Sequence, residues 1–195
     1  LVTYMFLHDS SSLQGGITHL FFNMFSLWMF GTMLERVLGS KRYLFYYLSC
    51  GVGAGLVQEL WWQLSWPDMV AEILAMQGVP SSQVGGIVSA WQQSGEISQF
   101  FNQLVTVGAS GAVFGILLAF GMLFPNLPMY IIPFPFPIKA KWMVLGYGLV
   151  ELAFGVTGAV AGVAHFAHLG GMLFGFIMIM VWKRKGTIGG GNGIY

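Results

Sequence analysis

A serine set among glycines is the first candidate for chemistry in this sequence. Ser110 lies within residues 107–115, Val-Gly-Ala-Ser-Gly-Ala-Val-Phe-Gly, at the head of an apolar run. A buried hydroxyl without a partner costs about 1–3 kcal/mol, so Ser110 needs either a bonding partner or a use. The glycines leave backbone N–H groups bare and leave space for a substrate chain. Such a serine could act as a nucleophile if a base and oxyanion donors lie nearby.

A purely structural role for Ser110 stays open at this point. Its hydroxyl could bond to a carbonyl of its own helix, and the neighbouring glycines could serve close helix packing. The depth of the other polar residues helps to separate the two interpretations.

Two further polar side chains lie at the same predicted depth as Ser110. Ser110 precedes Pro125 by fifteen residues, and His168 precedes Lys183 by fifteen residues. At about 1.5 Å per helical residue, both lie roughly 22 Å above the inner boundary of a membrane. Asn23 lies at a similar level on the first apolar run. Depth does not prove that these faces converge, but it favours a catalytic layer over polar packing.

This layer would suit nucleophilic catalysis. His168 would take the proton of Ser110 and later protonate the leaving amine. His19, Asn23 and the backbone N–H of Ser110 could hold the oxyanion, and such donors contribute several kcal/mol in the transition state.

His165 is a rival base, because it lies one helical turn from His168. Depth favours His168, which is level with Ser110, whereas His165 lies roughly 4.5 Å nearer the outer surface. The small-residue face of Gly171 and Gly175 also includes His168, although it does not exclude His165. We therefore expect His168 to be the base.

A metal site is a further possibility that the residue types raise. Glu151 is a lone acid within an apolar run, and an ionisable group at that depth is a functional candidate, although a structural partner in the bundle is equally plausible. His165 and His168 could face one ion with Glu151 or His19. The sequence has no H-E-x-x-H motif and no acidic pair, so we expect no metal and no cofactor.

The composition predicts that membrane-spanning helices hold these residues in place. Of 195 residues, 56% are hydrophobic and 8% are charged, and the mean hydropathy is +0.72. A soluble domain carries about 25% charged residues, so we expect an all-α, multi-pass membrane protein in contact with the lipid bilayer. The net charge of +1 gives no reason to expect a nucleic-acid partner. The predicted spans are residues 17–34, 43–62, 100–124, 142–163 and 166–182.

The basic residues predict the orientation of these spans. All eight Lys and Arg fall in connections that alternate along the chain: Arg36, Lys41, Arg42, Lys139, Lys141, Lys183, Arg184 and Lys185. The connections of the opposite face have no Lys or Arg, and they carry the acids Asp9, Asp68, Glu72 and Glu96. Because positive charge marks the cytosolic side, we expect the chain to begin outside and to end inside.

We expect one domain over residues 1–195 with an outer insertion at 65–99. Pro67 could begin a surface helix, a break follows at Gly78, and residues 83–93 are predicted to form a second short helix. This insertion could be a lid on the membrane surface or a loop without function.

Three motifs resemble those of the rhomboid intramembrane serine proteases. They are His19-x-x-x-Asn23, Gly108-x-Ser110-Gly111 and Ala167-His168-x-x-Gly171-x-x-x-Gly175. The resemblance implies a Ser110–His168 dyad, with His19 and Asn23 aiding the oxyanion. It also implies hydrolysis of peptide bonds in or near the transmembrane helices of protein substrates, without metal or ATP.

The same resemblance gives supporting roles to Gly108, Gly111 and Phe114. Phe114 stands where many relatives have a tyrosine that stacks on the catalytic imidazole, so the ring is kept and the hydroxyl is lost.

Members of the common type have six core spans, and the first is absent here, so we expect a fragment or a processed form. We expect a bacterial cytoplasmic (inner) membrane location, with the active site near the outer face. The alternative is a catalytically inactive rhomboid-like protein that binds transmembrane clients, and the presence of both Ser110 and His168 speaks against it.

Overall fold

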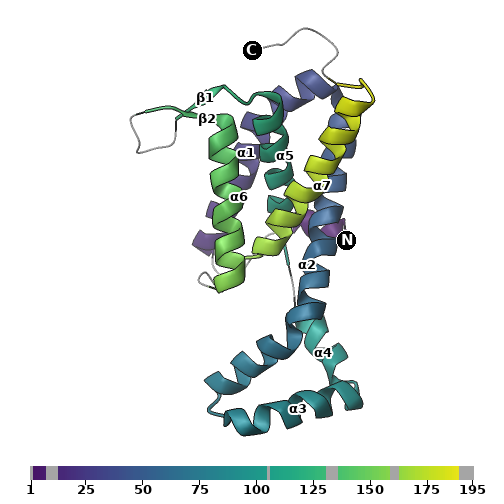
Figure 1. Cartoon of the computed structure of the whole chain (residues 1–195), viewed down its shortest axis with the longest axis vertical. Coiled ribbons are helices and arrows are strands. Elements are labelled where there is room, and N and C mark those ends of the chain that lie inside the picture. The colour runs from purple at the N-terminus through teal and green to yellow at the C-terminus, as the bar shows by residue number, and fades with distance from the viewer. Residues whose placement is uncertain (1, 8–12, 105, 131–135, 159–162, 189–195) are drawn as a thin grey trace. The chain divides into compact units, whose positions relative to one another are not determined.

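The computed structural model describes residues 2–7, 13–104, 106–130, 136–158 and 163–188. Asp9 and residues 159–162, which belong to predicted features, lie outside this part of the chain. The regular secondary structure of the described residues is helical apart from one short antiparallel strand pair, in which Pro128 pairs with Lys139 (Figure 1). The elements are the 3-10 helix η1 (Thr3–Phe6), α1 (Leu13–Leu38), α2 (Ser40–Met76), α3 (Ser81–Ser94), α4 (Glu96–Gln103), α5 (Ser110–Leu123), β1 (Pro128–Met129), β2 (Ile138–Lys139), α6 (Ala140–Thr157) and α7 (His165–Arg184).

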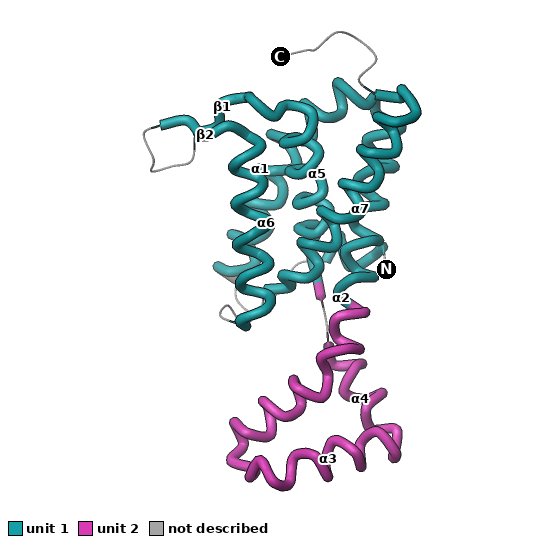
Figure 2. Tube along the Cα trace, in the orientation of Figure 1, with its two compact units in different colours: residues 1–58, 107–195 teal, residues 59–106 magenta. Residues whose placement is uncertain are grey.

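The chain divides into two compact units (Figure 2). Unit 1 comprises residues 1–58 and 107–195, and it holds η1, α1, the first half of α2 and α5–α7. Unit 2 comprises residues 59–106, with the second half of α2 and the helices α3 and α4. In α3 and α4 no described residue is buried within the fold.

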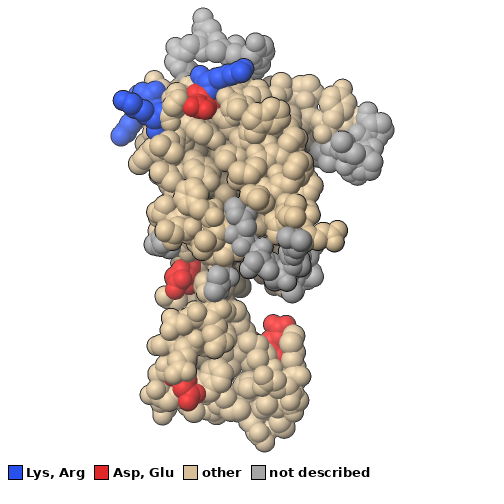
Figure 3. Space-filling model, turned by 180° about the vertical axis from the view of Figure 1, so that it is seen from behind, with Lys and Arg blue, Asp and Glu red and all other residues tan. Residues whose placement is uncertain are grey.

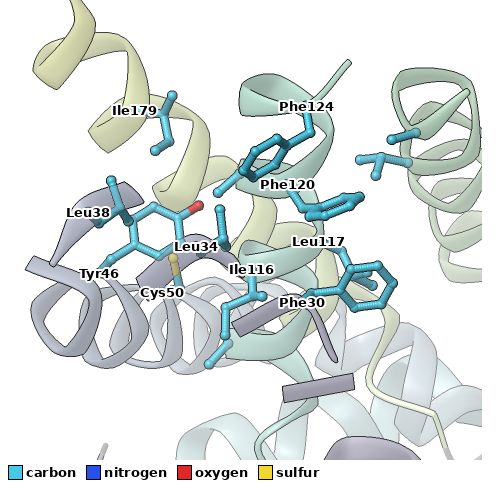
Figure 4. Packing of buried hydrophobic residues seen from close by; sticks show 14 of the residues in the cluster. Phe30, Leu34, Leu38, Tyr46, Cys50, Ile116, Leu117, Phe120, Phe124 and Ile179 are labelled. Carbon is cyan, nitrogen blue, oxygen red and sulfur yellow. The ribbon is translucent and has the colours of Figure 1, made fainter. Parts of the chain in front are cut away.

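Helix α5 is the centre of unit 1. Nine of its fourteen residues are buried, and it packs against α1, α6 and α7. The rings of Phe30 on α1 and Phe120 on α5 meet edge to face with their centroids 4.9 Å apart (Figure 4). The Tyr46 hydroxyl of α2 donates to the carbonyl of Gly115 at 2.7 Å. A tyrosine buried in an apolar core satisfies its hydroxyl in this way.

Small residues let α5 and α7 approach closely. A Cβ atom on Gly171 would collide with the carbonyl oxygen of Gly111, and a Cβ atom on Gly115 would lie 2.9 Å from the carbonyl oxygen of Gly171. A Cβ atom on Gly175 would collide with the Tyr46 hydroxyl. The prediction that Gly171 and Gly175 form a packing face is therefore confirmed.

Two helix predictions were wrong. Residues 100–124 do not form one helix, because α4 ends at Gln103 and α5 begins only at Ser110. Between them Gly108 has φ +107°, a conformation that breaks a right-handed helix and that glycine adopts without a steric penalty. Pro67 does not begin a helix but lies inside α2. Its fixed φ is compatible with helical backbone, although its missing N–H removes one hydrogen bond and its ring crowds the preceding turn of the helix. The predicted short helix at residues 83–93 is confirmed as part of α3.

Two helices of the described residues are long and apolar enough to cross a membrane: Gln14–Leu38 and His165–Arg184. Helix α5 has 14 residues and is apolar, but it is only about 21 Å long. The hydrocarbon core of a bilayer is about 30 Å thick, so Ser110, at the first position of α5, would lie within the bilayer if the other end of the helix were at the membrane boundary.

Basic side chains gather at one end of unit 1, as Figure 3 shows from behind. Lys183, near the end of α7, donates to the carbonyl of Met122 at 3.1 Å, next to the end of α5. Lys139 lies in the hairpin that follows α5, and Lys41 lies at the start of α2. Ser110 and His168 stand at the opposite ends of α5 and α7, away from these charges.

Candidate active site

Ser110 is presented by a turn that leads into a helix. It is the first residue of α5, directly after the left-handed turn at Gly108. The N–H of Gly108 donates to the carbonyl of Tyr4 in η1 at 2.9 Å, which ties the turn to the start of the chain. The first N–H groups of a helix lack partners in their own helix and carry partial positive charge, so the surroundings of Ser110 suit a developing negative charge.

His168 faces this serine from the first turn of α7. Its Nε2 atom lies 2.9 Å from Ser110 Oγ, which is hydrogen-bond distance, and the residue is only 8% exposed. The ring stacks on Phe114 with the centroids 4.2 Å apart and an interplanar angle of 10°. Phe114 lies one helical turn after Ser110 on α5, so one helix supplies both the hydroxyl and the surface that fixes the imidazole plane.

Two of the expected glycines hold these groups close together. A Cβ atom on Gly108 would stand 2.7 Å from Cε1 of His19, and a Cβ atom on Gly111 would collide with the side chain of Ala54. The structure thus brings Gly108, Gly111 and Phe114 to the Ser110–His168 pair, and it brings the His19 ring against the turn before Ser110.

Asn23 is buried at 5% exposure, one turn after His19 on α1. Its amide Nδ2 donates to the carbonyl of His19 at 3.0 Å. This bond orients the Asn23 side chain toward the His19 level of the helix. A carboxamide has two N–H donors, so the bond leaves a second one for another acceptor.

Glu151 of α6 contacts His168 at the ring nitrogen that faces away from Ser110, and the sequence did not predict this contact. Its Oε2 atom lies 2.9 Å from Nδ1 of His168 and 2.6 Å from Nδ1 of His165. The sequence marked Glu151 as a buried acid and grouped it with these histidines only as a metal ligand. The order of the helices could have indicated this contact, because α6 and α7 are consecutive and antiparallel, so the end of α6 meets the beginning of α7 (Figure 1).

Among the described residues, Glu151, His165 and His168 form a group that could hold a metal ion. Their ligand atoms lie within 4.8 Å of one another. The two separations of 2.6 and 2.9 Å are those of direct hydrogen bonds. Chemically, the arrangement places a hydroxyl, an imidazole and a carboxylate in a row, next to a helix N-terminus.

Comparison with known proteins agrees with the motifs. The chain is 31% identical over 162 residues to "Rhomboid protein 1, mitochondrial" of Saccharomyces cerevisiae, covering 82% of this chain and 36% of that protein. It is 29% identical to "RHOMBOID-like protein 4" of Arabidopsis thaliana, covering 93% of this chain and 35% of the relative. It is 28% identical to "Rhomboid protease GluP" of Bacillus subtilis, covering 83% of this chain and 22% of the relative.

These relatives are yeast, plant and bacterial proteins, and so they do not support the expected bacterial location. The chain spans little more than a third of the length of the yeast relative, and less of the other two. No solved structure matches it. The Rhomboid domain family matches residues 1–185, which is nearly the whole chain. With its three motifs on α1, α5 and α7 of one helical unit, the chain belongs to the rhomboid family.

Proposed function

We propose that this protein is an intramembrane serine endopeptidase with Ser110 as nucleophile and His168 as general base. The observation that carries the proposal is the 2.9 Å contact between Ser110 Oγ and His168 Nε2 at the start of α5. His168 takes the hydroxyl proton as Ser110 Oγ bonds to the scissile carbonyl carbon. The imidazolium then protonates the amine that leaves, and a water molecule, activated in the same way, hydrolyses the acyl-enzyme.

The oxyanion of the tetrahedral intermediate is held by donors around the turn before α5. The backbone N–H of Ser110, the second amide N–H of Asn23 and the ring of His19 are the proposed donors. Their support is the position of Ser110 at a helix N-terminus and the contact of the His19 ring with the Gly108 turn. Donors of this kind are worth roughly 10²–10³ each in kcat.

The substrates are transmembrane proteins that are cleaved in or near their membrane helices. Family membership and the apolar helices support a membrane setting. We infer five crossings, by α1, the first half of α2, α5, α6 and α7, with the basic end of unit 1 in the cytosol and Ser110 nearer the outer face. One protease domain then extends over residues 1–195, and its insertion at 65–99 lies outside.

The decisive experiment compares the wild type with Ser110→Ala in proteoliposomes that contain a model transmembrane substrate. The variant should lose cleavage and labelling by a fluorophosphonate, while its thermal unfolding stays within a few degrees of the wild type. Full cleavage by Ser110→Ala would refute the proposed nucleophile. A folded wild type that neither cleaves nor labels would favour the client-binding alternative.

A further inference from the structure

We propose that Glu151 is a positioning residue for His168, so that the proposed site is a Ser110–His168–Glu151 row and not a two-residue pair. This inference rests on the proposed hydrolytic function. It assigns the partly buried acid of α6 a role in catalysis that neither the motifs nor the relatives' names indicate.

The first step of the argument concerns the tautomer of His168. Its Nδ1 atom is 2.9 Å from Glu151 Oε2, and its Nε2 atom is 2.9 Å from Ser110 Oγ. An ionised carboxylate only accepts hydrogen bonds, so the ring must donate from Nδ1. The neutral imidazole then carries its lone pair on Nε2, facing the Ser110 hydroxyl. This is the tautomer that a general base needs.

The second step concerns the orientation of the ring. Phe114 stacks on its face, so the plane of the imidazole is set by α5. Rotation within that plane is limited by the two bonds at opposite sides of the ring, to Ser110 and to Glu151. Three contacts, two from α5 and one from α6, therefore hold a side chain of α7 in the attacking geometry.

The third step concerns how Glu151 itself is held. Its side chain is only 13% exposed, and an isolated buried carboxylate is costly. Nδ1 of His165 donates to the same Oε2 at 2.6 Å, so the oxygen that faces His168 is fixed by a second imidazole. His165, which the sequence raised as a rival base and as a metal ligand, thus helps to hold the carboxylate in place.

The fourth step concerns charge during the reaction. When His168 accepts the serine proton, it becomes an imidazolium next to the Glu151 carboxylate. In a site shielded from water this attraction is much stronger than in bulk solvent. The ionisable groups facing His168 among the described residues are Glu151 from α6 and His165 from its own helix, with the Ser110 hydroxyl from α5.

The test uses the full chain in proteoliposomes with three variants: Glu151→Gln, Glu151→Asp and Glu35→Gln. The Gln side chain can turn its NH₂ toward His168 Nδ1 and so favour the wrong tautomer. We expect kcat and the rate of fluorophosphonate labelling to fall about 10²–10⁴-fold, as for loss of the acid in a serine triad. KM should change by less than about threefold, because substrate binding does not use Glu151.

Glu151→Asp keeps the carboxylate and is one methylene shorter, so its kcat should lie between those of the wild type and Glu151→Gln. Glu35→Gln makes the same charge change on α1, sixteen residues beyond His19, and should leave kcat unchanged. A merely structural role would instead lower the melting temperature in parallel with activity and would not be rescued by Asp.

Wild-type kcat and labelling in a folded Glu151→Gln would overturn the inference. If Glu151→Gln does not fold, Glu151→Leu, which also removes the carboxylate, decides, and wild-type kcat and labelling in that folded variant would also overturn the inference. Ser110→Ala separates the two proposals: cleavage by that variant refutes the hydrolytic function, whereas its inactivity beside a fully active Glu151→Gln refutes only the role of Glu151.

Discussion

His168 Nε2 lies 2.9 Å from Ser110 Oγ across 58 residues of sequence. The contact joins the first residue of α5 to the first turn of α7, and it exists because glycines let the two helix backbones meet. The position of the pair therefore depends on backbone geometry at a few small residues as much as on the two side chains.

Gly108→Ala tests this dependence directly. Gly108 has φ +107°, and an added Cβ would lie 2.7 Å from Cε1 of His19. The strained backbone alone should cost about 1–3 kcal/mol in free energy of unfolding. The turn must also shift away from His19, and a misplacement of about 1 Å at the reacting group can cost 10²-fold in kcat. We expect both losses in thermal unfolding and cleavage assays.

Gly39→Ala is the matched control. Gly39 also has positive φ, +76°, but an added Cβ meets nothing within 4 Å. It should lose stability by a similar amount and keep its kcat. Equal kcat losses in both variants would show that the effect is general destabilisation and not displacement of Ser110.

Asn23→Ala tests the proposed oxyanion donor. Loss of one donor should lower kcat by roughly 10²–10³, less than the loss of Ser110. Thr32→Ala is the control, because Thr32 makes a comparable bond within α1, from Oγ1 to the carbonyl of Trp28 at 2.8 Å. If Asn23→Ala kept full kcat and only lowered the melting temperature, Asn23 would be a packing residue.

Much of the site could be predicted from the sequence, because the position of a residue along an apolar run, counted from its basic end, indicates its depth in the membrane. Counting residues from the basic ends placed Ser110 and His168 at one level, and the structure puts them in contact. The glycines after His168 predicted close packing with another helix, which Gly111 of α5 provides.

The remainder depends on features that hydrophobicity does not report. Apolar residues continue on both sides of Gly108, so the predicted span at 100–124 concealed the turn that begins α5 at Ser110. The contact of Glu151 with His168 depends on the rotation of α6 about its own axis. Low polarity all around a membrane helix leaves that rotation undetermined.

Chelation tests the other chemistry that the cluster could support. We expect EDTA to leave cleavage unchanged, because the proposed mechanism uses only Ser110, His168 and backbone or side-chain donors. A zinc metalloprotease treated in the same vesicles serves as the control for chelation. If EDTA abolished cleavage, and Zn²⁺ restored it in the wild type but not in Glu151→Gln, then Glu151, His165 and His168 would instead form a metal centre.

The final prediction separates the two histidines of α7. Both donate from Nδ1 to Glu151 Oε2, but it is His168 whose Nε2 lies at hydrogen-bond distance from Ser110 Oγ. His168→Ala removes the proposed base, so cleavage and fluorophosphonate labelling should both be abolished. His165→Ala removes a brace of the carboxylate and leaves the bond to His168 intact, so kcat should fall by about tenfold or less, the size of one hydrogen bond. The two variants are compared side by side for kcat, labelling rate and melting temperature. An inactive His165→Ala beside an active His168→Ala, with both proteins folded, would reverse the assignment of the base.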